Sequence, residues 1–68
     1  MKLSARNVLK GKVVSITKGA VNTEVTIDVG GAQVVSIITK ASAETLKLKK
    51  GAVAYAVIKS SDVMIATE

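Results

Sequence analysis

Five amino acids are missing from this sequence altogether: cysteine, histidine, proline, tryptophan and phenylalanine. Disulfide bonds and structural zinc sites, which stabilise many small domains, are therefore excluded. The absence of histidine and cysteine also removes the side chains most used for acid–base and thiol catalysis, and no suitably spaced pair of carboxylates replaces them. We therefore expect that the protein is not an enzyme, holds no covalent cofactor and binds no bare metal ion.

Aromatic side chains are almost absent as well, because Tyr55 is the only one. Proteins that bind single-stranded nucleic acid combine a basic groove with aromatic side chains on which the bases stack. Tyr55 lies in an apolar stretch, where we expect it to belong to the core. A basic surface without stacking would bind nucleic acid weakly and with strong salt dependence. We therefore expect no nucleic-acid partner, and a small nucleic-acid or protein-interaction module is kept as the alternative function.

Long hydrophobic runs are missing too. No apolar stretch approaches the roughly 20 residues of a membrane-spanning helix. The first three residues lead into Ser4 and Arg6 rather than into the apolar region of a signal peptide. These features predict a soluble, cytoplasmic protein with no membrane partner.

The chain is rich in hydrophobic residues, which make up 49% of its 68 residues, and it carries a formal net charge of +5. This length suits a single domain over residues 1–68, and such a small domain buries only about 60% of its unfolded surface. Residues 34–38 and 53–58 are apolar on both faces of a predicted strand, and no second layer is available to cover both faces. Because exposed apolar patches mark interfaces, we expect an obligate homo-oligomer, with a poorly covered monomer as the alternative. The positive charge favours anionic partners.

The alternation of apolar and polar residues predicts a mainly β fold. It is clearest in residues 21–29, and Gly30-Gly31 then forms the kind of two-residue link that closes a β-hairpin. The five expected strands are residues 7–17, 21–29, 32–39, 52–59 and 62–66, with Ser60-Ser61 as the turn before the last. With one short helix between the third and fourth strands, this order predicts an OB-like five-stranded barrel.

A helix of two to three turns is expected between Lys40 and Lys50. Ser42 is its expected N-cap, and Gly51 is the expected residue that ends it. The lysines that precede Gly51 would offset the helix dipole, and a binding patch is the alternative role for them.

Two polar clusters near the ends of the chain contain the groups that an oxyanion site requires. Such a site needs converging N–H and O–H donors and one or two cations partly shielded from water. Ser4 and Arg6 are two residues apart, so they point the same way in an extended segment. Lys59 and Ser60 close the fourth strand and open a turn. We expect the two clusters to meet across a subunit interface, and for Ser60 a plain turn is the alternative.

Four blocks of the sequence follow one another in a characteristic order: SARNVLKGKV (residues 4–13), KGAVNTEV (18–25), SIIT (36–39) and VIKSSDVM (57–64). Together they span nearly the whole chain and resemble the molbindin (Mop) family. The resemblance implies a cytoplasmic OB-like domain that binds molybdate or tungstate and takes part in molybdenum homeostasis. It also implies a homohexamer, a trimer of dimers. Because no DNA-binding or nucleotide-binding domain is attached, we expect the stand-alone storage form.

The resemblance also implies which residues hold the oxyanion. The implied interfacial contacts are Ser4, Ala5, Arg6, Thr39, Lys59 and Ser60. A second class of site near a three-fold axis would involve the loop from Lys18 to Thr23, with Lys18 and Asn22 as its contacts. Whether molybdate or tungstate is the natural ligand, and whether the role is storage, buffering or delivery, stays open at this point.

Overall fold

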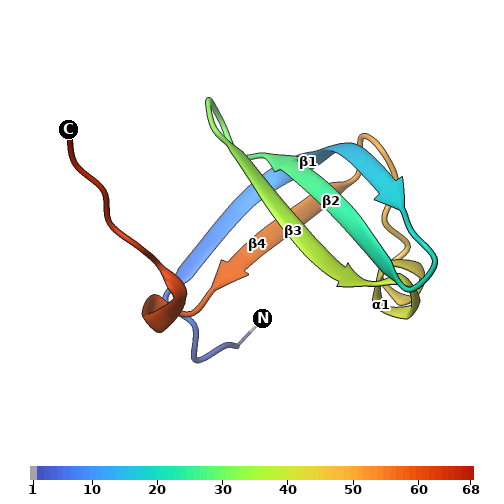
Figure 1. Cartoon of the computed structure of the whole chain (residues 1–68), viewed down its shortest axis with the longest axis horizontal. Helices are drawn as coiled ribbons and strands as arrows, with labels where there is room; N and C mark the ends of the chain where they lie inside the picture. The colour runs from blue at the N-terminus through green and yellow to red at the C-terminus, as the bar shows by residue number, and fades with distance from the viewer. Residues whose placement is uncertain (1) are drawn as a thin grey trace.

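The computed structural model describes residues 2–68. It contains a single antiparallel sheet of four strands with one short α-helix after the third strand (Figure 1). The elements are β1 (Asn7–Lys18), β2 (Asn22–Asp28), β3 (Gln33–Thr39), α1 (Lys40–Thr45), β4 (Val53–Ile58) and the 3-10 helix η1 (Ser60–Asp62). The spatial order is β3-β2-β1-β4, and the bent sheet forms a half-barrel.

The predicted hairpin between β2 and β3 is confirmed. The Val29 N–H donates a hydrogen bond to the Ala32 carbonyl at 2.9 Å and closes a two-residue turn. Gly30 and Gly31 both have positive φ angles, 94° and 96°. A type I′ turn requires this conformation at both central positions, which explains why two glycines stand there.

A β-bulge divides β1 into two parts. Val13 pairs with Ile27 of β2 while Ser15 pairs with the neighbouring Thr26, so Val14 is an extra residue without a partner. Because side chains alternate along a strand, the extra residue changes which positions face the interior. Val13 is buried before the bulge, and Ile16 packs against the core after it. The bulge thus lets one twelve-residue strand bend while keeping apolar side chains inside.

The core is small and lies on the concave side of the half-barrel. Its buried centre consists of Val13, Val25 and Ile27. The partly buried residues that pack around this centre are Ile16, Val29, Ile38, Leu48 and Ala54. Few side chains are fully buried, so the isolated chain gains limited stability from burial.

Helix α1 begins and ends earlier than expected. Its N-cap is Thr39 rather than Ser42, because the helix starts directly where β3 ends and Thr39 Oγ1 accepts a hydrogen bond from the Ser42 N–H at 3.1 Å. After six residues the chain turns left-handed at Lys47 (φ 54°), not at Gly51, and the last turn contains no basic residue. This early end allows Leu48 to pack against the core. Gly51 (φ 90°) lies instead in the turn before β4.

The expected fifth strand, residues 62–66, is not formed. Asp62 belongs to η1, and residues 63–68 are paired with no strand among residues 2–68. Val63 is locally extended (φ −91°, ψ 123°), but η1 directs the segment away from the sheet (Figure 1). The sheet therefore has four strands instead of five, and the predicted barrel stays open between β3 and β4.

The outer faces of the two edge strands carry exposed apolar side chains. On β3 these are Val35 (59% exposed) and Ile37 (67%), and on β4 they are Val53, Tyr55 and Val57. The prediction that both strands are apolar on two faces is confirmed. The prediction that Tyr55 belongs to the core is wrong, because Tyr55 lies on the outward side of β4 and is 47% exposed.

Candidate functional site

The two polar clusters expected from the sequence lie at the same end of the β1–β4 pair. Asn7, the first residue of β1, pairs with Ile58, the last residue of β4. Arg6 and Lys59 are the residues immediately outward of this pair, and Figure 1 shows the N-terminal segment beside η1. The pairing of β1 with β4 thus places both clusters at the same end of a single chain, and their meeting across a subunit interface stays a prediction.

Hydrogen bonds within β1, β4 and η1 stabilise this end of the molecule. The Asn7 side-chain amide donates to the Ile58 carbonyl at 3.3 Å. Inside η1, the Asp62 N–H donates to the Lys59 carbonyl at 2.9 Å, and the Val63 N–H donates to the Ser60 carbonyl at 3.3 Å. The predicted turn at Ser60 is therefore formed, as one turn of 3-10 helix directly after β4.

The side chains of this first cluster lie open to solvent. Ser4, Arg6, Lys59 and Ser60 are exposed, and Ala5 is half-buried. Two cations and two hydroxyls match the donor set of an oxyanion site. Water screens exposed charges strongly, so a single chain offers the donors without the shielding that firm binding needs.

Thr39, Asn22 and Lys18 lie at the opposite end of β1. Asn22 pairs with Thr39, and Lys18 pairs with Thr23. The structure therefore separates Thr39 from the cluster around Arg6 within one chain and groups it with the predicted contacts of the second site. The Thr39 hydroxyl also has a structural role, because it caps α1 and donates to Ser42 Oγ at 2.8 Å.

A small pocket of about 80 Å³ lies at this second end. Its polar lining consists of Lys18, Lys40, Lys47, Glu44 and Thr23. Three of these groups are cations and one is a carboxylate. Thr23 is only 1% exposed, and its Oγ1 lacks a hydrogen-bond partner among residues 2–68. The sequence places Thr23 at the end of the predicted second-site loop, but it does not predict that Lys40 and Lys47 line the same pocket. Their convergence depends on the pairing of β1 with β2 and on the early end of α1.

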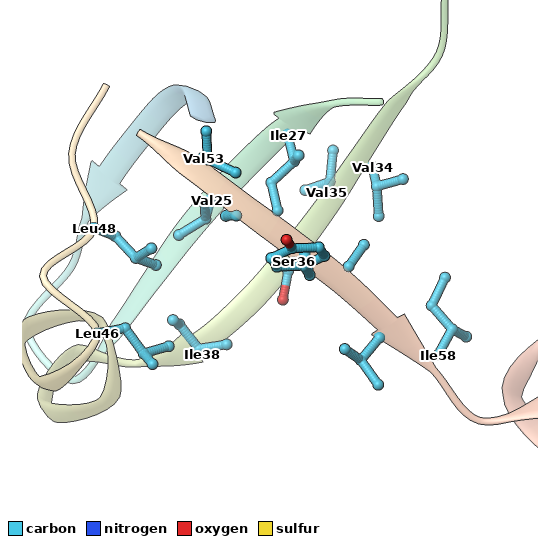
Figure 2. A pocket seen from close by; sticks show the side chains of 14 residues that line it. Val25, Ile27, Val34, Val35, Ser36, Ile38, Leu46, Leu48, Val53 and Ile58 are labelled. Carbon is cyan, nitrogen blue, oxygen red and sulfur yellow. The ribbon is translucent and has the colours of Figure 1, made fainter. Parts of the chain in front are cut away.

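A larger groove of about 710 Å³ opens between β3 and β4 (Figure 2). It is lined by Val25, Ile27, Val34, Val35, Ser36, Ile38, Leu46, Leu48, Val53, Ala54, Tyr55, Ala56, Val57 and Ile58. None of these residues is charged, and only Ser36 and Tyr55 carry a side-chain polar atom. The groove is therefore unsuited to an oxyanion and suited to apolar side chains.

The described part of the chain can also be examined for metal-binding clusters and for membrane-spanning helices. Across residues 2–68, no three side chains of histidine, cysteine, aspartate or glutamate gather closely enough to hold a metal ion. In the same residues, no helix is long and apolar enough to span a membrane.

Comparisons with known proteins relate the chain to molybdenum-binding proteins. A "Probable molybdenum-pterin-binding protein" from Haemophilus influenzae is 52% identical over 69 residues, which covers 100% of both chains. The structure of MopII from Clostridium pasteurianum superposes with a TM-score of 0.91 at 51% identity and covers 97% of this chain and 100% of its own. The cytoplasmic molybdate-binding protein ModG, solved with molybdate bound, matches with a TM-score of 0.90 at 49% identity over 94% of this chain and 46% of ModG.

The family model described as the TOBE domain matches residues 3–65. This match covers both ends of β1 and reaches into the segment that follows η1. Together with the identity to the molybdenum-pterin-binding proteins over the whole chain, it confirms the resemblance noted in the sequence: the chain belongs to the Mop (molbindin) family and carries a TOBE domain over residues 3–65.

Proposed function

We propose that this protein binds molybdate as an intact oxyanion, in the cytoplasm, and performs no chemistry on it. The observation that carries the proposal is the pairing of Asn7 with Ile58, which brings Arg6 and Lys59 to the same end of the sheet. Support comes from relatives whose names describe binding of molybdenum-pterin and from ModG, which was solved with molybdate bound. Tungstate, a dianion of the same shape, is an expected second ligand.

The first cluster has the chemistry that a tetrahedral dianion requires. Arg6 presents a planar fork of N–H donors, whereas Lys59 supplies a compact charge. The hydroxyls of Ser4 and Ser60 can donate to the remaining oxygens. We assign these four residues to the main site, with the backbone at Ala5 beside them. Because they are exposed in the single chain, a second copy must cover them to exclude water.

The second cluster is proposed as a distinct site for the same class of ligand. Lys18 and Asn22 remain its assigned residues, and Thr39 joins them because it pairs with Asn22. The lysines that line the adjacent small pocket add positive charge there. Oxyanion binding at this end would therefore depend on residues that lie far from Arg6 along β1.

We further propose that the protein acts as a homo-oligomer, with a hexamer built from dimers as the expected assembly. The isolated chain exposes Val35, Ile37 and Val53 by more than half of their surface. Apolar surface of this extent is rare on monomers and typical of interfaces. A nucleic-acid function gains no support from the structure, because the one aromatic residue, Tyr55, borders an apolar groove that lacks charge.

Isothermal titration calorimetry can test the proposal directly. The protein is titrated at physiological salt with molybdate, tungstate, sulfate and a single-stranded oligonucleotide. We expect saturable binding of molybdate and tungstate, weaker binding of sulfate because its bonds are shorter, and no saturable binding of the oligonucleotide. Equal affinity for molybdate and sulfate, or saturable binding of the oligonucleotide alone, would overturn the proposal.

A further inference from the structure

The small pocket beside α1 gathers several cations around one carboxylate. Figure 1 shows α1 next to the end of β1 and the start of β2, which is where the pocket lies. Its charged lining residues are Lys18, Lys40, Lys47 and Glu44. Three ammonium groups and one carboxylate leave a net positive charge, so the pocket favours an anion.

A buried hydroxyl group at this pocket lacks a hydrogen-bond partner. Thr23 lines the pocket and is 1% exposed, and its Oγ1 is unpartnered among residues 2–68. Because side chains alternate along β2, Thr23 faces the interior while Glu24 faces solvent. An unpartnered buried hydroxyl is unfavourable, and an anion bound in the pocket would supply the acceptor that it lacks.

Lys47 occupies a backbone position that favours glycine. Helix α1 ends in a left-handed capping turn, in which the Lys47 N–H donates to the Glu44 carbonyl at 3.0 Å. Lys47 has φ 54° and is the only non-glycine residue with positive φ among residues 2–68. Glycine adopts this conformation without the steric penalty of a lysine. A lysine here therefore brings a cation to the pocket and lowers the stability of the turn.

Glu44 determines which anion suits the pocket. It lies four residues after Lys40 in α1, so the two side chains share one face of the helix. An ionised carboxylate only accepts hydrogen bonds, so it repels an oxyanion without a proton and bonds to one that keeps an O–H. Near neutral pH, molybdate, tungstate and sulfate carry no proton, whereas hydrogen phosphate keeps one. One acceptor among several donors therefore matches hydrogen phosphate and disfavours molybdate.

The pocket also has a suitable size. A water-sized atom needs roughly 10–15 Å³, so a volume of about 80 Å³ holds on the order of five to eight such atoms. A phosphorus atom with its tetrahedral set of oxygens is within this range, whereas a nucleotide is far larger. A phosphate monoester also fits less well, because it loses its last proton near about pH 6 and then offers Glu44 no O–H.

We propose that this pocket binds inorganic hydrogen phosphate, at a site separate from those for molybdate. The lysines supply the charge, the Thr23 hydroxyl donates to one oxygen, and the Glu44 carboxylate accepts the O–H of the ion. Of the residues assigned to the second molybdate site, only Lys18 lines this pocket, and Asn22 and Thr39 lie outside its lining. The inference goes beyond the proposed molybdate function and does not depend on it.

Calorimetry near neutral pH and at physiological salt tests the choice of anion. The protein is titrated with phosphate, sulfate and glycerol phosphate, which represents the monoesters. We expect saturable binding of phosphate and at least ten-fold weaker binding of the other two ions. Absence of saturable phosphate binding, or an equal affinity for either of the other ions, would overturn the proposal.

The role of Glu44 has a charge-matched control. Glu44→Gln removes the negative charge that repels sulfate, so the preference for phosphate over sulfate should fall about ten-fold. Glu24→Gln makes the same change on the outward face of β2 and should leave the preference unaltered. An unaltered preference in Glu44→Gln, or an equal change in both variants, would contradict selection by this carboxylate.

Lys47 and Thr23 provide tests in which loss of binding is not loss of folding. Lys47→Gly should raise the melting temperature and lower the phosphate affinity about three-fold, the modest change expected of an exposed charge. Lys47→Ala removes the cation but keeps a Cβ, so it should lose the affinity without this gain in stability. Thr23→Val should fold normally and bind phosphate about ten-fold more weakly. Unchanged phosphate affinity in Lys47→Gly and Thr23→Val would overturn the site.

Backbone amide NMR of the unmodified protein locates the bound ion. Phosphate should shift the signals of Thr23 and Lys47 and leave those of Asn7 and Ile58 in place. Shifts confined to Asn7 and Ile58 would show that phosphate enters the proposed main molybdate site instead, which contradicts a separate pocket. Because none of these measurements uses molybdate, a failure here is distinguishable from a failure of the proposed function.

Discussion

Asn7 and Ile58 form the outermost pair of the β1–β4 ladder. The Asn7 side-chain amide also donates a hydrogen bond to the Ile58 carbonyl at 3.3 Å. These two residues are 51 positions apart in the sequence. Their pairing determines that the residues just outside it, Arg6 and Lys59, belong to one end of the molecule. The proposed main site is thus a consequence of strand register.

Replacing Arg6 by alanine should weaken molybdate binding. A hydrogen bond to a charged group contributes about 1.5–3 kcal/mol, so the affinity should fall about ten-fold or more. Arg6→Lys should recover part of the affinity, because it keeps the charge and loses the planar fork. Calorimetry measures the molybdate affinity of both Arg6 variants. Lys50→Ala, which also removes one positive charge but lies away from the site, is the control. An unchanged affinity in Arg6→Ala would remove this residue from the site.

Molybdate should raise the thermal stability of the folded protein. A ligand that binds only the native state stabilises it by mass action, by about 2.7 kcal/mol when its concentration is 100 times Kd. For a domain of this size, each kcal/mol raises Tm by roughly 4–8 °C. Melting curves with molybdate and with equal concentrations of sulfate provide the comparison, since sulfate controls for general salt effects. Identical curves would count against a native-state molybdate site.

Replacing Gly11 by alanine should destabilise the sheet. A Cβ at this position would lie 2.3 Å from the Asp28 carbonyl oxygen and 2.6 Å from Ile27 Cγ2, so backbone must move. Overpacking of this kind destabilises proteins by about 1–3 kcal/mol. Urea unfolding of Gly11→Ala, with the exposed Thr17→Ala on the same strand as control, measures the difference. Equal midpoints would show that β1 and β2 can separate at little cost.

Replacing Thr23 by valine should leave the protein as stable or make it more stable. The buried Thr23 hydroxyl has no partner among residues 2–68, and an unsatisfied buried hydroxyl destabilises by about 1–3 kcal/mol. Valine has a similar shape and removes the polar atom. Chemical unfolding of Thr23→Val, with the exposed Thr17→Val as control, tests this. A clear loss of stability would indicate that the hydroxyl is bonded in the assembled protein.

Replacing Thr39 by alanine separates its two assigned roles. Loss of the N-cap of α1 should lower stability by about 1 kcal/mol. Thr39→Ser keeps the hydroxyl and should behave like the unmodified protein. If Thr39 also contacts the oxyanion, calorimetry of Thr39→Ala will show reduced molybdate stoichiometry or affinity at the second site. A stability loss with unchanged binding would leave Thr39 as a cap only.

Four of the five expected strands are present with boundaries close to those predicted, because each depends on local properties. The alternation of apolar and polar residues around Val25 predicts β2, and the pair Gly30-Gly31 predicts the turn after it. Both features depend only on residues close in the sequence, so the sequence is enough to recognise them. The sequence does not determine the N-cap, because Thr39 and Ser42 both carry a hydroxyl suited to that position, and Thr39 is at the same time the last residue of β3. The sequence does not show that Tyr55 faces outward, because a strand that is apolar on both sides does not reveal which of its faces is inward.

The sequence by itself determined the class of the protein: small, basic, mainly β and without histidine or cysteine. These properties follow from composition and short-range order, and the four sequence blocks add the resemblance to the Mop family. Only the tertiary structure decided that the segment before Asn7 and the segment after Ile58 lie at the same end of the sheet, that Thr39 pairs with Asn22, and that the barrel stays open. Each of these depends on the register between strands distant in the chain, and register results from how all the strands pack together. The pairing of β1 with β4 therefore places the two polar clusters near the chain ends at the same end of the molecule.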